Sequence, residues 1–284
     1  MIYHYSDANA LRSIIENKEL WLTGHEYMND VQEFDDGFNL LKDKIRDYFV
    51  SAGIDSSAQA VIEHIISRLE STLAFSCSFS NEADLLSQWR SYCPEDGGFS
   101  IGFDQDVLRA SVVNPGAPKN IRKFEDCIYE PEEKLRQALL HAEHCTNGLL
   151  QQIGNGRESS TYYTTFLSFL TYCLRCKNEH FREESEVRLI TYAHNAMQLI
   201  QVQDVSGMAP QSIFSEEEIS FRTNKNIFVP YIKQKFDVSA VKEIYIGPCK
   251  NFDTVLKGLT LFLRSQGLHE QIEVKQSEIP FRRW

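Results

Sequence analysis

The sequence lacks the features that mark membrane and secreted proteins. No stretch approaches the roughly 18 apolar residues that a membrane-spanning helix needs, and residues 1–9 have neither the basic start nor the apolar core of a secretory signal. We therefore expect a cytoplasmic protein without a membrane partner. The 284 residues also contain no internal repeat, low-complexity tract or Pro/Ser-rich linker, which argues against a repeat array or a string of linked modules.

Basic residues and paired cysteines are scarce as well. The 29 Lys and Arg residues against 40 Asp and Glu residues give a formal charge of -11, so contact with nucleic acid would need a local basic patch. The seven cysteines are an odd number spread over a long chain, unlike the framework of small secreted domains, and we expect reduced thiols. Cys173 and Cys176 form one C-x-x-C with histidines nearby, but no second such pair exists, and we assign no metal site.

What the sequence does contain is an ordinary globular composition, with 42% hydrophobic and 24% charged residues. Helical spacing of apolar residues predicts helices at 7–17, 34–49, 62–69, 84–92, 252–266 and twice within 132–178. An aromatic strand is predicted directly before the first helix, and alternation and turn residues predict further strands at 20–23, 72–79, 99–103, 121–129, 186–192, 219–223, 227–232, 243–246 and 272–275. Strands at both ends enclose the helical middle, which predicts one α+β domain over residues 1–284 with a helical insertion at about 131–180.

Two blocks in the first third carry polar side chains on predicted strands. In Tyr3-His4-Tyr5-Ser6 an imidazole precedes a helix that Ser6 can cap, and it can bind a ligand hydroxyl or anion there, although a structural histidine is the commoner case. In the strand at 72–79, alternation points Ser76, Ser78 and Ser80 to one side, either into a polar cleft or towards solvent or a helix. Cys77 lies on the apolar side, where burial raises the pKa of a thiol and disfavours a thiolate nucleophile.

Two later blocks add aromatic and charged candidates. Trp89 and Tyr92 lie three residues apart on a short helix, so they can stack on a flat ring or belong to the core, and the core is favoured for Trp89. If a strand begins near Glu184, then Glu184, Glu186 and Arg188 share one face. Two buried carboxylates need compensation, so this is either an exposed, mutually paired strip or part of an active site.

Taken in order, these blocks resemble a bacterial family catalogued as a domain of unknown function. The blocks are YHYS, LWLT, MND-x-x-E (Met28, Asn29, Asp30 and Glu33), FSCSFS, W-x-x-Y, GGFSIGF, E-x-E-x-R and IYIGP. That family in turn resembles a distant branch of the ADP-ribosyltransferase superfamily, which includes DarT toxins and RNA 2′-phosphotransferases. The resemblance implies a split mixed β-sheet that binds NAD in a cleft.

The resemblance also implies roles for individual residues. Glu186 would be the catalytic carboxylate accompanied by Glu184, and His4 would hold the ribose on the nicotinamide side. The remaining NAD-binding positions implied are Tyr5, Ser76, Ser78, a stacking aromatic (Tyr92 first, Trp89 second), and Arg188 or Arg90 for the diphosphate.

The implied activity is cleavage of the nicotinamide–ribose bond by an NAD-dependent ADP-ribosyltransferase or NAD glycohydrolase, such as a toxin or anti-phage defence effector. The alternative is a non-catalytic regulatory module that binds a nucleotide or a protein. The acceptor (protein, nucleic acid or water) and a regulatory protein partner stay open.

Overall fold

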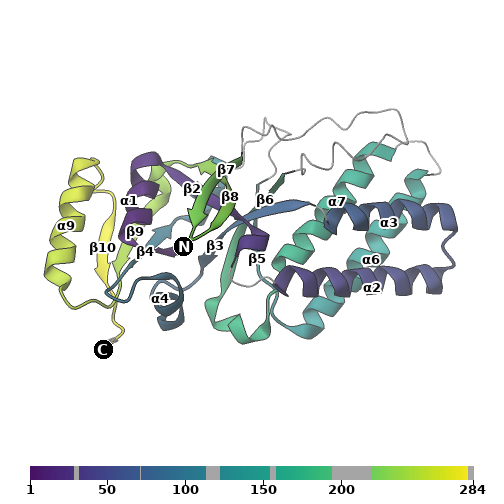
Figure 1. The fold of residues 1–284 in the computed structure, drawn as a ribbon, viewed down its shortest axis with the longest axis horizontal. Helices are drawn as coiled ribbons and strands as arrows, with labels where there is room; N and C mark the ends of the chain where they lie inside the picture. Colours follow the sequence, from purple (N-terminus) through teal and green to yellow (C-terminus); the bar gives the residue numbers. More distant parts are fainter. Residues whose placement is uncertain (29–31, 71, 113–121, 154–157, 194–218, 281–284) are drawn as a thin grey trace.

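The structure, a computed structural model, describes residues 1–28, 32–70, 72–112, 122–153, 158–193 and 219–280. It has a large mixed β-sheet with a group of long helices beside it, so the predicted α+β class is confirmed (Figure 1). One continuous cluster of buried apolar side chains runs through the sheet and these helices. No helix in the described ranges combines the length and apolar character needed to cross a bilayer.

The sheet brings the two ends of the chain together. Its main path runs β10-β9-β4-β1-β3-β2-β8-β7, and β6 pairs with both β3 and β5. The β9–β10 pair is parallel and the other pairs are antiparallel. The strands are β1 (Ile2–Ser6), β2 (Glu19–Gly24), β3 (Leu73–Ser80), β4 (Phe99–Phe103), β5 (Lys123–Asp126), β6 (Glu186–Ala193), β7 (Ile219–Asn224), β8 (Ile227–Lys235), β9 (Val241–Ile246) and β10 (Glu273–Gln276).

The long helices α2 (Gln32–Ala52), α3 (Ser56–Glu70), α6 (Pro131–Ile153) and α7 (Glu158–Arg175) pack together at one end of the sheet (Figure 1). Close packing is possible at Gly37 of α2, where a Cβ atom would lie 2.8 Å from the Cβ of Cys176. The predicted insertion therefore corresponds to α6, α7 and the 3-10 helix that follows, but α2 and α3 complete the bundle. The shorter helices are α1 (Ala8–Asn17), α4 (Leu86–Tyr92), α5 (Gln105–Val112) and α9 (Phe252–Ser265).

The sheet is split along one edge of β3. The other edge pairs with β6 over its whole length, from Leu73 to Ser80. On the split edge, β1 pairs only at Ser80, through Tyr3, whereas β2 pairs only at Ser76 and Phe75. Because two strands share one edge, they diverge between these points, and α1 joins their far ends. A split mixed sheet was predicted, and these registers place the split.

Two local predictions are wrong. The N-cap of α1 is Asp7 and not Ser6, because the Asp7 carboxylate accepts the N–H of Ala10 at 2.7 Å, three residues further on. Glu184 does not belong to the strand, because it ends a 3-10 helix (Glu179–Glu184) and Ser185 follows in a left-handed conformation with φ 44°. Strand β6 begins at Glu186, so Glu186 and Arg188 share a face but Glu184 arrives from a turn.

Candidate active site

A cavity of about 540 Å³ lies where β1 and β2 separate, and we call it the cleft. Its size falls in the range of small-molecule sites. Seven of the predicted site residues line it: His4, Tyr5, Ser76, Ser78, Tyr92, Glu184 and Glu186. Helix α1 and strand β2 contribute further lining side chains. Segments remote in sequence thus meet at the split, whereas Trp89 and Arg188 are not among the lining residues.

His4 closes part of the gap in the sheet. Its Nδ1 lies 2.9 Å from the backbone carbonyl of Ser78, which points into the split. A carbonyl can only accept, so Nδ1 carries the proton, and in the neutral ring Nε2 is an acceptor. Burial lowers the pKa of His4, although the bond to Ser78 opposes the shift, so the neutral form dominates at pH 7. His4 therefore supports the cleft with one nitrogen and can accept a ligand hydroxyl with the other.

The serines of β3 follow one face, as predicted. Ser80 donates to the backbone carbonyl of Glu184 at 2.7 Å, which ties β3 to the turn before β6. Ser76 donates to the Met28 sulfur at 3.1 Å. The Ser78 hydroxyl is buried and has no hydrogen-bond partner in the described part of the chain. Of the three serines, Ser78 is therefore the one whose hydroxyl proton is still available to a ligand.

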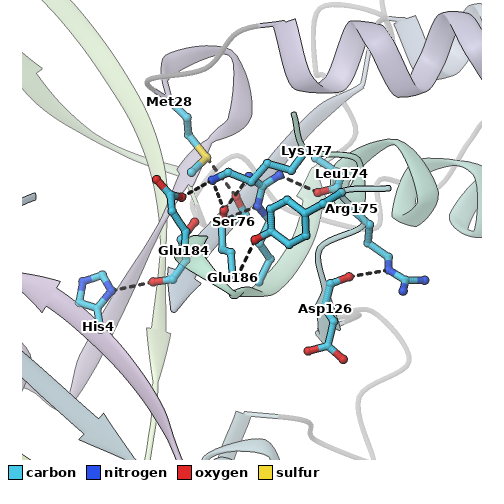
Figure 2. A network of polar contacts seen from close by, with 12 residues as sticks. His4, Met28, Ser76, Asp126, Leu174, Arg175, Lys177, Glu184 and Glu186 are labelled. Carbon is cyan, nitrogen blue, oxygen red and sulfur yellow. Dashed lines mark hydrogen bonds and ion pairs between the residues drawn. The ribbon is translucent and has the colours of Figure 1, made fainter. Parts of the chain in front are cut away.

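Four buried charged side chains form what we call the charge cluster: Lys177, Glu184, Glu186 and Arg188. Figure 2 labels three of them, Lys177, Glu184 and Glu186. The Lys177 ammonium donates to Glu184 at 2.6 Å and also to Glu186. Arg188 binds Glu186 with Nε at 2.7 Å and Nη2 at 3.2 Å, and its Nη1 donates to the Leu174 carbonyl at 2.7 Å. Two cations and two anions make the cluster neutral, so the ion pairs offset the desolvation cost of burying both carboxylates.

The ionisation of Glu186 follows from these contacts. Burial alone would raise its pKa, but the charges of Arg188 and Lys177 and their hydrogen bonds lower the pKa to about 2. Glu186 is therefore a carboxylate throughout the physiological pH range. Three donors occupy three of its roughly four lone-pair positions, so one position remains for a ligand hydroxyl.

Lys177 is the main charged residue that sequence reasoning missed. It lies just after the end of α7 and belongs to the predicted insertion, so this segment contributes a cation to the charge cluster (Figure 2). A signal existed in principle, because two carboxylates and one arginine need a second cation if all are buried. Nothing in the spacing identified which of the chain's lysines would supply it.

The aromatic candidates take different positions. Tyr92 lines the cleft, and 40% of the residue is exposed. The partial burial of the side chain and the negative charge of Glu184 raise the pKa of its hydroxyl to about 12. Tyr5 also lines the cleft, but its hydroxyl is occupied, donating to Glu82 at 2.8 Å and accepting from Leu85 at 3.0 Å. Its ring packs edge-on against Trp89, with centroids 4.7 Å apart.

The positions of Trp89 and of the two candidate arginines differ from the roles that the resemblance implies. Trp89 is buried, donates to the Asp84 carboxylate at 2.6 Å and does not line the cleft, so the second choice of stacking residue takes the core position that the sequence favoured for it. Arg188 is committed to Glu186 and Leu174 and does not line the cleft, so it is not placed to meet a diphosphate; Arg90 does not line it either. Burial raises the pKa of Cys77 to about 12, which disfavours the thiolate reading further.

Comparisons with known proteins reach part of the chain. Residues 88–189 match the model of a family described as "Protein of unknown function (DUF2971)". The expected resemblance to a family of unknown function is confirmed over this stretch, which holds W-x-x-Y, GGFSIGF and E-x-E-x-R. The YHYS and FSCSFS blocks precede it, and Asn29 and Asp30 of the MND block lie outside the described residues. No curated protein and no solved structure matches the chain.

No group of three or more His, Cys, Asp or Glu side chains within the described ranges could hold a metal ion. The groups that line the cleft include the neutral imidazole of His4, serine hydroxyls, tyrosine side chains and the ionised carboxylate of Glu186. These groups suit recognition of a polyhydroxylated ligand, and the carboxylate suits a centre where positive charge develops.

Proposed function

We propose that the protein is an NAD-dependent ADP-ribosyltransferase or NAD glycohydrolase that cleaves the nicotinamide–ribose bond. The observation that carries this proposal is convergence: His4 from β1, Ser76 and Ser78 from β3, and Glu186 from β6 line one cleft at a split in the sheet. These are the positions that the resemblance assigns to NAD. From the resemblance we also propose a cytoplasmic toxin or anti-phage defence effector.

The chemistry needs few groups. When the bond between the ribose C1′ and the ring nitrogen breaks, its electron pair leaves with neutral nicotinamide and positive charge develops on the sugar. Glu186 would accept a hydrogen bond from the ribose 2′-hydroxyl and stabilise that positive charge, and His4 Nε2 would orient the sugar. Tyr92 would hold the departing ring. A protein side chain, a nucleobase or water would then attack C1′ and lose its proton.

Conversion of NAD to free nicotinamide tests the proposal. The purified protein is incubated with NAD, with and without a cell lysate as a source of acceptors, and nicotinamide is quantified by liquid chromatography. Substituting Glu186→Gln should slow its release by about 10²- to 10³-fold, as expected for the loss of one preorganised group. Wild-type protein that leaves NAD unchanged in every mixture would refute the proposal.

Two further variants separate chemistry from folding. Glu186→Gln alone leaves the charge cluster with an extra positive charge, whereas Glu186→Gln with Lys177→Met keeps it neutral and should be equally inactive. His4→Asn keeps a donor for the Ser78 carbonyl but removes the acceptor Nε2, so it should fold and lose most activity. Circular dichroism verifies the fold. Full activity in a folded His4→Asn variant would remove His4 from the mechanism.

The charge cluster favours a second candidate, a non-catalytic module that binds a nucleotide. Lys177 and Arg188 neutralise Glu186, which weakens its attraction for a developing cation. This reading predicts that NAD raises the melting temperature of the protein without being consumed. Glu186→Gln would then change affinity only. Release of nicotinamide by the wild type decides against it.

A further inference from the structure

The wall of the cleft formed by β2 carries an aromatic surface that the proposed chemistry does not use. Trp21 lines the cleft and stacks on Tyr231 of β8, with ring centroids 4.3 Å apart and planes inclined by 24°. Tyr231 is buried and does not line the cleft. The indole is therefore the member of the pair that faces the cavity, and the phenol ring behind it fixes its orientation.

A cation lies on the same wall. Arg222 of β7 is the sole lysine or arginine among the described residues that line the cleft. Its Nη2 donates to the Thr23 hydroxyl at 3.1 Å, which uses one of the five N–H donors of the guanidinium. The positive charge of Arg222 lowers the pKa of Cys77, although burial raises that pKa by more. Because Cys77 also lines the cleft, the charge of Arg222 acts inside the cleft. Arg222 is thus held by Thr23 with donors to spare.

The other polar groups of the cleft are less suited to an anion. The first turn of α1 lies in the lining, but there the Asp7 carboxylate already accepts the N–H of Ala10. Lys177 and Arg188 are held by the two glutamates. A phosphate in the cleft would therefore be met at Arg222 and not beside Glu186.

The part of the cleft at Arg222 and Thr23 and the part at Glu186 are separated along β3. Thr23 pairs with Ser76, whereas Ser80 pairs with Glu186, so the partners of the two regions lie four residues apart on β3. At about 3.4 Å per residue this is roughly 14 Å. A ligand that reaches both regions must be extended, as a dinucleotide is.

We propose that Trp21 and Arg222 form a nucleotide subsite, in which the indole stacks on a base and the guanidinium binds the adjoining phosphate. The subsite rests on the proposed function only for the source of the nucleotide. That source is the adenosine diphosphate half of NAD or the nucleotide of a nucleic-acid acceptor. Both present an aromatic base next to a phosphate, and base–aromatic stacking tolerates any base.

Titration calorimetry with ADP-ribose and, separately, with a short single-stranded oligonucleotide tests the subsite. Trp21→Ala and Arg222→Gln should each weaken binding about 10-fold or more, whereas Trp21→Phe retains most affinity. Lys233→Gln is the matched control, because Lys233 pairs with Trp21 across β2 and β8, is exposed and does not line the cleft. Arg222 is exposed, so Arg222→Gln should keep the fold if Trp21→Ala does not.

The outcomes separate the two sources and the two proposals. Losses confined to ADP-ribose assign the subsite to NAD, and losses confined to the oligonucleotide assign it to the acceptor. Because ADP-ribose has no nicotinamide bond, its binding supports the subsite even if NAD is never consumed. Wild-type affinity of both variants for both ligands, or no binding by the wild type, overturns the subsite, while nicotinamide release would leave the proposed function standing.

Discussion

Replacing Lys177 by methionine tests how the charge cluster is held together. The side chains of Lys177 and Glu184 are 6% and 8% exposed, and that of Glu186 is 5% exposed. Methionine fills similar space but leaves two buried carboxylates with Arg188 alone. Removing one partner of a buried ion pair costs about 3–5 kcal/mol, so we expect a loss of that size in the free energy of unfolding.

A second substitution should restore much of the loss. In Lys177→Met with Glu184→Gln the remaining Glu186–Arg188 pair is neutral, so the double variant should be about 2 kcal/mol more stable than the single-variant losses predict when added. The assay is urea unfolding at pH 7 with all four members of the cycle. Lys42→Met is the control, because Lys42 pairs with Glu70 at 2.9 Å but the side chains are 24% and 49% exposed.

The control should lose less than about 1 kcal/mol, as exposed ion pairs do. Two results would refute the reasoning. If Lys177→Met and Lys42→Met cost the same, burial does not strengthen the Lys177 contacts. If the double variant shows no recovery, Glu184 is not the group that Lys177 neutralises.

Two further predictions follow from the pH response and from packing. Because the pKa of Glu186 is lowered to about 2 from 4.5, its ionisation contributes about 3 kcal/mol to the free energy of unfolding above pH 4.5, and this contribution is lost as the pH falls towards 2. The free energies of unfolding at pH 3 and pH 6 should therefore differ less in Glu186→Gln than in the wild type. Equal differences in the two proteins would contradict this. In Gly247→Ala the new Cβ would lie 2.8 Å from the Trp89 ring, so we expect the free energy of unfolding to fall by about 1–3 kcal/mol and the melting temperature to fall with it. The control is Gly258→Ala, which should be neutral or stabilising because its Cβ would have no atom within 4 Å. Equal melting temperatures of the two variants would count against the contact.

Local patterns predicted most elements of the fold. The FSIGF segment after the turn of two glycines was predicted as β4 to the residue, and Leu11, Ile14 and Ile15 on one face predicted α1. Helix α5 was missed, although Asp104 caps it by accepting the N–H groups of Asp106 and Val107. Whether a segment is a helix or a strand can be predicted where its periodicity is sustained, whereas the prediction of a short element depends on recognising its cap.

The site was predictable only where side chains alternate along strands. Ser76, Ser78 and Glu186 could be placed because a strand presents alternate residues to one face. The position of Glu184 depends on the left-handed conformation of Ser185, and the burial of Lys177 depends on where α7 ends, so neither follows from spacing. Trp21 did carry a signal, since it alternates with the buried Leu20 and Leu22.

The arms of the split have a simple origin in the chain. Both come from residues 2–24, a contiguous stretch in which α1 spans the opening between β1 and β2. One extra helical turn lengthens such a span by about 5.4 Å. Because β1, α1 and β2 all belong to this stretch, an insertion or deletion within it would alter one side of the cleft and leave Glu184 and Glu186 on the other side unchanged.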